Sequence, residues 1–178
     1  MHAVIEMLTQ RVDYPRFAKI FYSEEFNAGL VEAVNVKERE VRERVEQADG
    51  KLHLRVYVAP RVNMPVVIEK LTAGYKIGYE ETIDFDPQAK HARIELATPG
   101  PLELKADIKF SEEPDGIRTR IEFEVRVKVF GVAGFAEKYI IQETKQRYVI
   151  VERELQRYVD EGRDLAEPAA QPPLEVLH

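Results

Sequence analysis

Residues 117–158 constrain the fold more than any other part of the chain, because an alternating segment leads there into a long amphipathic one. Between residues 117 and 129, odd positions are apolar or threonine and even positions are charged. This period of two is typical of a strand with one buried face. After residues 130–134, which contain two glycines, apolar residues recur at helical spacing as far as Tyr158. An amphipathic helix of this length needs an apolar surface, so we predict that it lies on a sheet.

Six further strands and two short helices are predicted from alternation and from the turn signals between segments. Residues 36–47 fit either a helix face or a charged edge strand, and we favour the strand. Asp49-Gly50 is a strong hairpin signal that joins this segment to the next. The later strands follow one another without intervening helices, which predicts an antiparallel α+β fold. The expected strands are 3–12, 36–47, 52–58, 75–85, 89–98, 102–110 and 117–129, and the expected helices lie within 17–34 and 135–158.

The length and the composition of the C-terminal residues define the domain organisation. The chain has 178 residues, enough for one domain with a substantial core. Towards the C-terminus, alanine, proline, glutamine and glutamate dominate and large apolar residues are few. Such a segment offers little apolar surface for packing. We therefore expect one domain over residues 1–162 and a flexible tail over residues 163–178.

Charge and residue usage exclude several classes of function. There are 26 Lys and Arg residues against 32 Asp and Glu, a net charge of −6, so the basic surface of a nucleic-acid-binding protein is missing. The absence of cysteine excludes disulfides, thiolate metal sites and thiol catalysis. Neither a signal peptide nor a membrane-spanning run is evident. We expect a cytoplasmic protein without stable membrane insertion, and the sequence does not predict its oligomeric state.

The order of elements, with the sequence FGVAGFAEK at residues 130–138 leading into the last helix, resembles the START-like or SRPBCC helix-grip superfamily, which contains the birch pollen allergen. The resemblance covers residues 3–160. Gly131, Gly134 and Glu137-Lys138, together with the Glu/Gln-rich last helix, are similar to a bacterial family of uncharacterised function within it. The resemblance implies an α+β helix-grip fold, in which a curved antiparallel sheet of about seven strands surrounds a long C-terminal helix and two short helices follow the first strand. It also implies a hydrophobic cavity, which in relatives holds lipids, sterols or polyketides and occasionally hosts cyclisation or dehydration.

Few residues carry a recognisable chemical signature. The chain lacks H-E-x-x-H, G-x-S-x-G, a P-loop and G-x-G-x-x-G. Its four histidines are dispersed, and His53 and His91 occupy outward positions of their predicted strands, which indicates surface residues. The mixed-sign runs 37–44 and 152–157 are expected to be solvated faces. We therefore assign no metal, no cofactor and no catalytic residue.

Glu81 is the sharpest candidate for a functional side chain, because it shares the inward register of its predicted strand with Tyr79 and Ile83. A buried carboxylate is costly unless it is paired, protonated or near water. One interpretation is that Glu81 anchors the polar end of a ligand or acts as a general acid or base. The other is that Gly78 introduces a bulge that turns Glu81 outward, where Glu80-Glu81 is an ordinary surface pair.

Four tyrosines, Tyr75, Tyr79, Tyr139 and Tyr148, fall on surfaces of the sheet and the last helix that should face one another. Their hydroxyls suit the polar part of an amphipathic ligand. The alternative is that the rings only fill the core, since a buried tyrosine commonly satisfies its hydroxyl on the backbone.

Residues 60–72 form a nearly continuous apolar run, which fits a short helix or a flap better than a half-buried strand. Met64 and Val67 belong to this run, and a flexible thioether suits a pocket entrance. The alternative is that the run plugs the mouth of the sheet and completes the core.

Together with the resemblance, these features lead to one expected function and two alternatives. We expect binding of a small hydrophobic or amphipathic ligand, lipid- or polyketide-like, between the sheet and the last helix, without chemistry. The first alternative is a cyclase- or dehydratase-like enzyme that uses Glu81 or a tyrosine as acid or base. The second is a filled-core module that binds a protein partner through an exposed sheet edge. The expected ligand-binding residues are Met64, Val67, Tyr79, Glu81, Ile83, Ile121, Phe123, Tyr139 and Tyr148.

Overall fold

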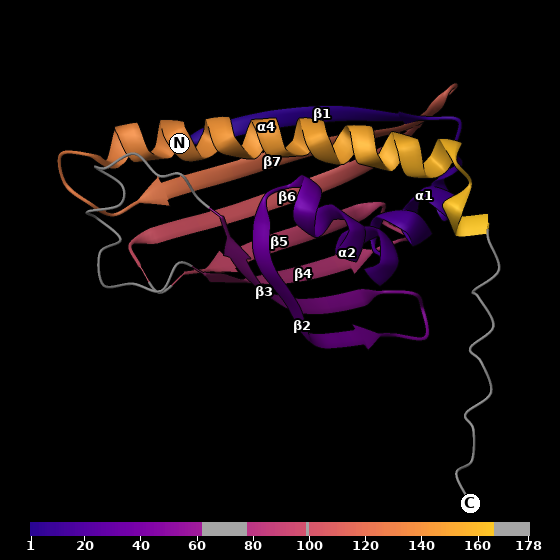
Figure 1. Cartoon of the computed structure of the whole chain (residues 1–178), viewed down its shortest axis with the longest axis horizontal. Helices are drawn as coiled ribbons and strands as arrows, with labels where there is room; N and C mark the ends of the chain where they lie inside the picture. Colours follow the sequence, from indigo (N-terminus) through magenta and orange to yellow (C-terminus); the bar gives the residue numbers. More distant parts are fainter. Residues whose placement is uncertain (62–77, 99, 166–178) are drawn as a thin grey trace, which may run out of the picture.

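A curved antiparallel sheet wraps around one long helix in this protein (Figure 1). A computed structural model describes residues 1–61, 78–98 and 100–165. The strands are β1 (His2–Gln10), β2 (Val36–Glu46), β3 (Leu52–Pro60), β4 (Tyr79–Asp86), β5 (His91–Ala97), β6 (Leu102–Glu113) and β7 (Gly116–Val127). The helices are α1 (Tyr14–Phe21), α2 (Glu24–Ala33), α4 (Ala133–Asp160) and the short 3-10 helix η1 (Arg163–Leu165).

The strand order confirms the predicted α+β helix-grip class. The seven strands follow the order β1-β7-β6-β5-β4-β3-β2, and each neighbouring pair is antiparallel. Only β1 crosses over, because the two short helices carry the chain from one edge of the sheet to the other. The segment that fitted either a helix or a strand is β2, the opposite edge strand.

Short polar side chains begin each of the two early helices. Asp13 accepts a hydrogen bond from the backbone N–H of Arg16 at 2.9 Å, and Pro15 occupies the first turn of α1, where its missing N–H is not needed. Ser23 accepts a hydrogen bond from the backbone N–H of Phe26 at 3.2 Å at the start of α2. Both helices therefore start where a side chain satisfies a first-turn N–H group.

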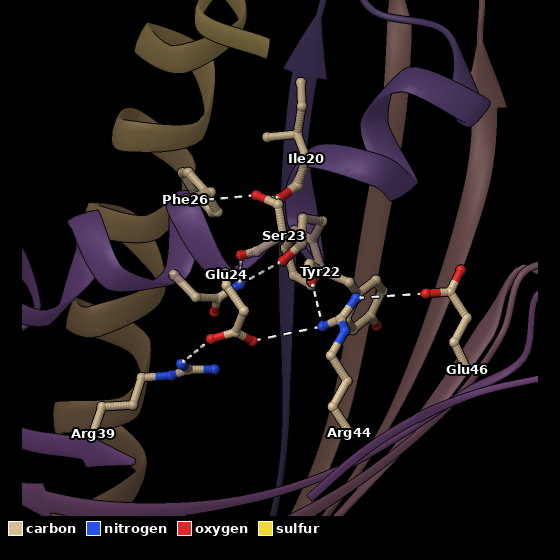
Figure 2. A network of polar contacts seen from close by, with 10 residues as sticks. Ile20, Tyr22, Ser23, Glu24, Phe26, Arg39, Arg44 and Glu46 are labelled. Carbon is tan, nitrogen blue, oxygen red and sulfur yellow. Dashed lines mark hydrogen bonds and ion pairs between the residues drawn. The ribbon is translucent and has the colours of Figure 1, made fainter. Parts of the chain in front are cut away.

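Ion pairs tie the start of α2 to the edge strand β2 (Figure 2). Glu24, in the first turn of α2, pairs with Arg39 at 3.0 Å and with Arg44 at 3.5 Å. Arg44 also donates to the backbone carbonyl of Tyr22 at 3.2 Å. The charged run 37–44 was expected to be a solvated face, but these contacts use two of its arginines to hold α2 over one edge of the sheet.

Side chains of α4 form hydrogen bonds with the opposite edge of the sheet, where the helix lies along β1 and β7 (Figure 1). An edge strand presents backbone N–H groups without a strand partner. Glu152 accepts a hydrogen bond from the N–H of Leu8, and Gln156 accepts one from the N–H of Gln10, each at 2.8 Å. The prediction that run 152–157 is only a solvated face is therefore wrong for these two residues, because a helix lying beside an edge strand can satisfy the strand's free donors.

A cluster of aromatic rings anchors α1 to the inner face of the sheet. Phe17 is fully buried and stacks on Phe21, with ring centroids 5.4 Å apart. It also meets Phe110 of β6 edge-on, again at 5.4 Å. Tyr22 stacks on Phe85 of β4 at 4.2 Å. Such ring pairs add to the free energy of apolar burial, so this cluster is a rigid part of the core.

The outer face of the sheet carries the paired polar residues. His53 and His91 point outward, as predicted, and contact Asp84 at 2.6 Å and Asp107 at 2.8 Å on neighbouring strands. Across the described ranges, no cluster of three or more potential metal ligands occurs. No helix within these ranges is long and apolar enough to span a membrane.

Two segments predicted from the sequence lie largely outside the residues that the structure describes. Most of the apolar run 60–72 falls within residues 62–77, which are outside the described residues. Of the predicted tail, residues 163–165 are described, and they form η1. There Asp164 pairs with Arg16 of α1 at 2.7 Å, which links the end of the described chain to its first helix.

Candidate functional site

The concave face of the sheet, α2 and α4 border a cavity of about 230 Å³. Strands β3 to β7 supply a largely aliphatic floor, and the two helices supply the opposite wall. Thr144, Tyr148 and Val151 of α4 are half-buried and line the cavity, whereas Leu155, one turn further, is fully buried in the core. The same face of α4 therefore lines the cavity at one end and packs into the core at the other. The volume lies just below the ~300–1,000 Å³ typical of ligand pockets, which suits a compact ligand.

Six of the nine residues predicted to bind a ligand line this cavity. They are Tyr79, Glu81, Ile83, Ile121, Phe123 and Tyr148. Tyr139 is not among the lining residues, because it packs with a smaller cluster around Val127 and Ala136. Met64 and Val67, predicted at the entrance, lie outside the described residues, as does Tyr75.

The register of β4 places Glu81 on the inner face. Pairing with β3 continues without a shift from Val58 opposite Tyr79 to Leu52 opposite Phe85. Glu81 itself lies between Val56 of β3 and Leu96 of β5. The alternative interpretation, in which a bulge turns Glu81 outward, is therefore wrong. A carboxyl group occupies the middle of an otherwise aliphatic patch.

The surroundings of Glu81 disfavour its charged form. By accessible surface the residue is only half-buried, because it borders the cavity, but its carboxyl group lies deep inside the protein. Burial raises its pKa above the usual value for glutamate. Arg39, Arg147 and a hydrogen bond from Tyr79 oppose this rise without cancelling it. Among the described residues, Glu81 forms no ion pair.

Tyr79, Glu81, Arg147 and Tyr148 form a polar cluster that joins β4 to α4. Nη1 of Arg147 donates to the hydroxyl of Tyr79 at 3.4 Å, a long hydrogen bond. Burial, and then the charge of Glu81, raise the pKa values of both tyrosines. These mutual effects show that the four polar groups lie close together at one place in an apolar cavity, which is the usual organisation of a ligand site.

Sequence reasoning missed the two arginines of the cavity wall, Arg39 and Arg147. The position of each arginine relative to inward-facing residues of its element could have identified it. Arg147 follows Thr144 by three residues and precedes Val151 by four, which places it beside the inward stripe of the helix. Arg39 shares a face of β2 with Val41. For Arg39, in the run 37–44, charge was taken to indicate a solvated face, but a long arginine side chain can lie along apolar surface and place its guanidinium inside.

One buried hydroxyl of a residue that lines the cavity has no hydrogen-bond partner within the described parts of the chain. It belongs to Tyr22, whose oxygen is buried and whose ring lines the cavity. Burial raises the pKa of this phenol well above its usual range, so it stays protonated and can donate. Asn27, another polar lining residue, is already engaged, since its amide donates to the carbonyls of Phe21 and Ser23.

The raised pKa of Glu81 predicts a pH-dependent gain of stability in Glu81→Gln. In the unfolded chain the carboxyl group titrates near 4.5. Above that pH, and up to the higher pKa of the folded state, the folded protein holds more protons than the unfolded one, so its stability falls as pH rises. Glutamine does not titrate. We therefore expect the stability of Glu81→Gln relative to the wild type to increase with pH above 4.5 and then to level off, in urea unfolding followed by circular dichroism.

The neighbouring variant Glu80→Gln is the matched control for this prediction. Glu80 lies on the opposite face of β4, where it pairs with Arg42 at 2.9 Å and Arg55 at 3.2 Å. It should show no such gain. A relative stability of Glu81→Gln that stays constant, or falls, with rising pH would contradict the buried-carboxyl interpretation.

Comparisons with known proteins support the fold and leave the activity open. The family described as "Protein of unknown function (DUF2505)" matches residues 8–159. No curated protein matches the chain. Among solved structures, TTHA0849 from Thermus thermophilus superposes with a TM-score of 0.63 and 14% identity, covering 91% of this chain and 99% of that one.

Two further structures have the same architecture. Ara h 8.0201 has a TM-score of 0.59 and 13% identity, and the match covers 90% of this chain and 98% of that one. The Zhui aromatase/cyclase from Streptomyces sp. R1128 has a TM-score of 0.53 and 9% identity, with 96% of this chain and 98% of that one covered. At such low identities the likeness establishes a shared fold, here the helix-grip fold, and the activity has to be argued from the site.

Proposed function

Because the chain belongs to the family described as "Protein of unknown function (DUF2505)", which assigns no activity, we propose a function from the cavity itself: binding of a small amphipathic molecule between sheet and helix. The observation that carries this proposal is the cavity of about 230 Å³ with an aliphatic floor and one polar cluster. Apolar burial would supply most of the affinity, at ~25 cal/mol per Å² of buried surface. The polar cluster would orient the ligand.

The chemistry of the wall indicates a lipid- or polyketide-like ligand with a polar group at one place. Leu96, Leu104 and Ile121 offer only dispersion and apolar contact. Tyr79, Glu81 and Arg147 offer hydrogen bonds and charge on the facing surfaces of β4 and α4. A fully apolar ligand would leave these groups desolvated and unpaired, at a cost in free energy. The cavity also counts against a filled-core module, whose inner face would be closed by side chains.

A second candidate function is acid–base catalysis on a bound ligand, of the cyclase or dehydratase kind. The specific observation in its favour is Glu81, a carboxyl group inside the cavity whose pKa is raised by burial and which Tyr79 contacts. A raised pKa suits a group that donates and accepts protons near neutral pH. The name of the Zhui aromatase/cyclase is consistent with such chemistry on this fold, although the resemblance to it is structural. Turnover that Glu81→Gln abolishes while ligand binding persists would favour this candidate.

The first experiment is native mass spectrometry of the purified protein, followed by titration with two uncharged probes, 2-acetonaphthone and 2-undecanone. We expect either a co-purified mass that is lost on denaturation or one-to-one binding of at least one probe. The aromatic and the aliphatic probe test two ligand shapes with the same polar group. A mass without adduct, together with no binding of either probe in calorimetry, would overturn the proposed function.

A further inference from the structure

We propose that the ligand of this cavity is an acid, and that Arg147 binds its carboxylate. This inference rests on the proposed function and adds the chemical class of the ligand. It requires that Arg147 lies in the cavity wall, that its charge is not already neutralised by a close partner, and that a carboxylate could reach it beside the apolar floor. The structure bears on each of these points.

Arg147 is a wall residue with a free hydrogen-bonding capacity. It lines the cavity from α4 and is half-buried. Its side chain makes the long hydrogen bond to the hydroxyl of Tyr79. In residues 1–61, 78–98 and 100–165 it forms no ion pair, although the chain is rich in carboxylates. A partly desolvated guanidinium that forms no ion pair with the described residues is unfavourable by itself, so an anionic ligand group would gain from filling this position.

The second arginine of the cavity wall, unlike Arg147, forms an ion pair with a carboxylate of the protein. Arg39 enters from β2, and its guanidinium pairs with Glu24 of α2 at 3.0 Å (Figure 2). Arg39 therefore already has a carboxylate partner in the protein, which it shares with Arg44. Arg147 lacks such a partner among the described residues, which singles it out as the cation that is available to a ligand.

Glu81 does not take the place of the missing partner. It forms no ion pair with Arg147 within the described ranges, and Tyr79 lies between the two groups as an acceptor from Arg147 and a donor to Glu81. Burial favours the neutral form of Glu81, which weakens its competition with a bound carboxylate. A protonated carboxyl group and the tyrosine hydroxyls add donors beside Arg147.

The apolar floor of the cavity determines which kind of molecular body could carry the carboxylate. Glu81 is flanked across the sheet by Val56 and Leu96, so the polar cluster is surrounded by aliphatic side chains. A carboxylate held by the planar fork of an arginine would thus continue into a hydrocarbon or aromatic body. Fatty acids and aromatic acids share this chemistry, and probes of both shapes can distinguish them.

The test compares acids with ketones of nearly the same shape. Binding of 2-naphthoate and of 2-acetonaphthone, and of decanoate and of 2-undecanone, is measured by calorimetry at neutral pH. We expect one acid to bind about tenfold more tightly than its ketone, because a charge-assisted hydrogen bond is stronger than a neutral one. If 2-naphthoate is the acid that binds more tightly, the ligand is an aromatic acid. If decanoate binds more tightly, the ligand is a fatty acid.

Arg147→Gln should remove this preference, so that acid and ketone bind with similar affinity, and an unchanged circular dichroism spectrum would show that the variant is folded. Arg153→Gln is the matched control, since it removes the same charge from an exposed position of the same helix. Glu81→Gln is a second, independent variant, which keeps a neutral donor beside Arg147 and should therefore retain the preference for the acid. Equal binding of acid and ketone by the wild type, or a preference that survives in Arg147→Gln, would overturn the inference while leaving the proposed function intact.

Discussion

Leu96→Trp is expected to abolish ligand binding without unfolding the protein. Leu96 lines the cavity from β5 and is half-buried, opposite Glu81 on one side and Leu104 on the other. An indole at this position would occupy the space beside the polar cluster. We expect the affinity for the better-bound probe to fall by at least about tenfold, because the ligand loses both volume and apolar contact. Filling a cavity commonly raises stability by about 0.5–2 kcal/mol, so the midpoint of thermal unfolding should not fall.

Glu95→Trp controls for the new aromatic ring. Glu95 is the preceding residue of the same strand and is exposed on the outer face, where it contacts Lys105 at 3.2 Å. Loss of such an exposed ion pair costs at most about 1 kcal/mol. Binding should be unaffected, since the added ring lies outside the cavity. Equal affinities of Leu96→Trp and the wild type would mean that the ligand binds elsewhere.

Phe17→Ala is expected to cost about 3–5 kcal/mol of folding free energy, the largest loss of stability that we predict. Phe17 is fully buried and contacts both Phe21 and Phe110 through its ring. Its removal deletes apolar burial and leaves a void that rigid neighbouring rings cannot fill. Because Phe21 and Tyr22 also line the cavity, the affinity for the probes should fall as well. Urea unfolding and calorimetry measure the two effects.

Phe130→Ala is the matched control, because Phe130 is fully exposed at the turn before α4. Removing the same ring from the surface should change the free energy of unfolding by no more than about 0.5 kcal/mol. If Phe17→Ala also changed it by less than about 1 kcal/mol, the ring cluster could not be the anchor of α1.

Much of the fold could be predicted because it follows from local periodicity. The alternation of β7 and the helical stripe of α4 were read directly from the sequence, and the order of elements gave an antiparallel α+β fold, which the resemblance to a known superfamily narrowed to the helix-grip class. Element ends shifted by a few residues, since capping and pairing decide them. The inward position of Glu81 also followed from alternation, once pairing with β3 showed no bulge.

The residues predicted to bind a ligand border the cavity more consistently where they belong to the sheet than where they belong to the last helix. Ile83, Ile121 and Phe123 line the cavity because a strand sends alternate side chains to one face. Tyr139 is not among the residues that line the cavity, because α4 extends past the cavity and its first turns pack with a separate small cluster. Arg147 was missed because a search for apolar residues at helical spacing leaves out a charged residue at the border of the inward face of α4.

By itself the sequence determined the order of strands and helices along the chain and which residues of a strand share one face, because both depend on backbone geometry between near neighbours. Only the tertiary structure decided that a cavity remains between sheet and helix, and that Arg39 pairs with Glu24 while Arg147 forms no ion pair with any described residue. The physical reason is distance along the chain. Packing density and ion pairing depend on atoms brought together from remote segments, and no local pattern records how closely those segments approach.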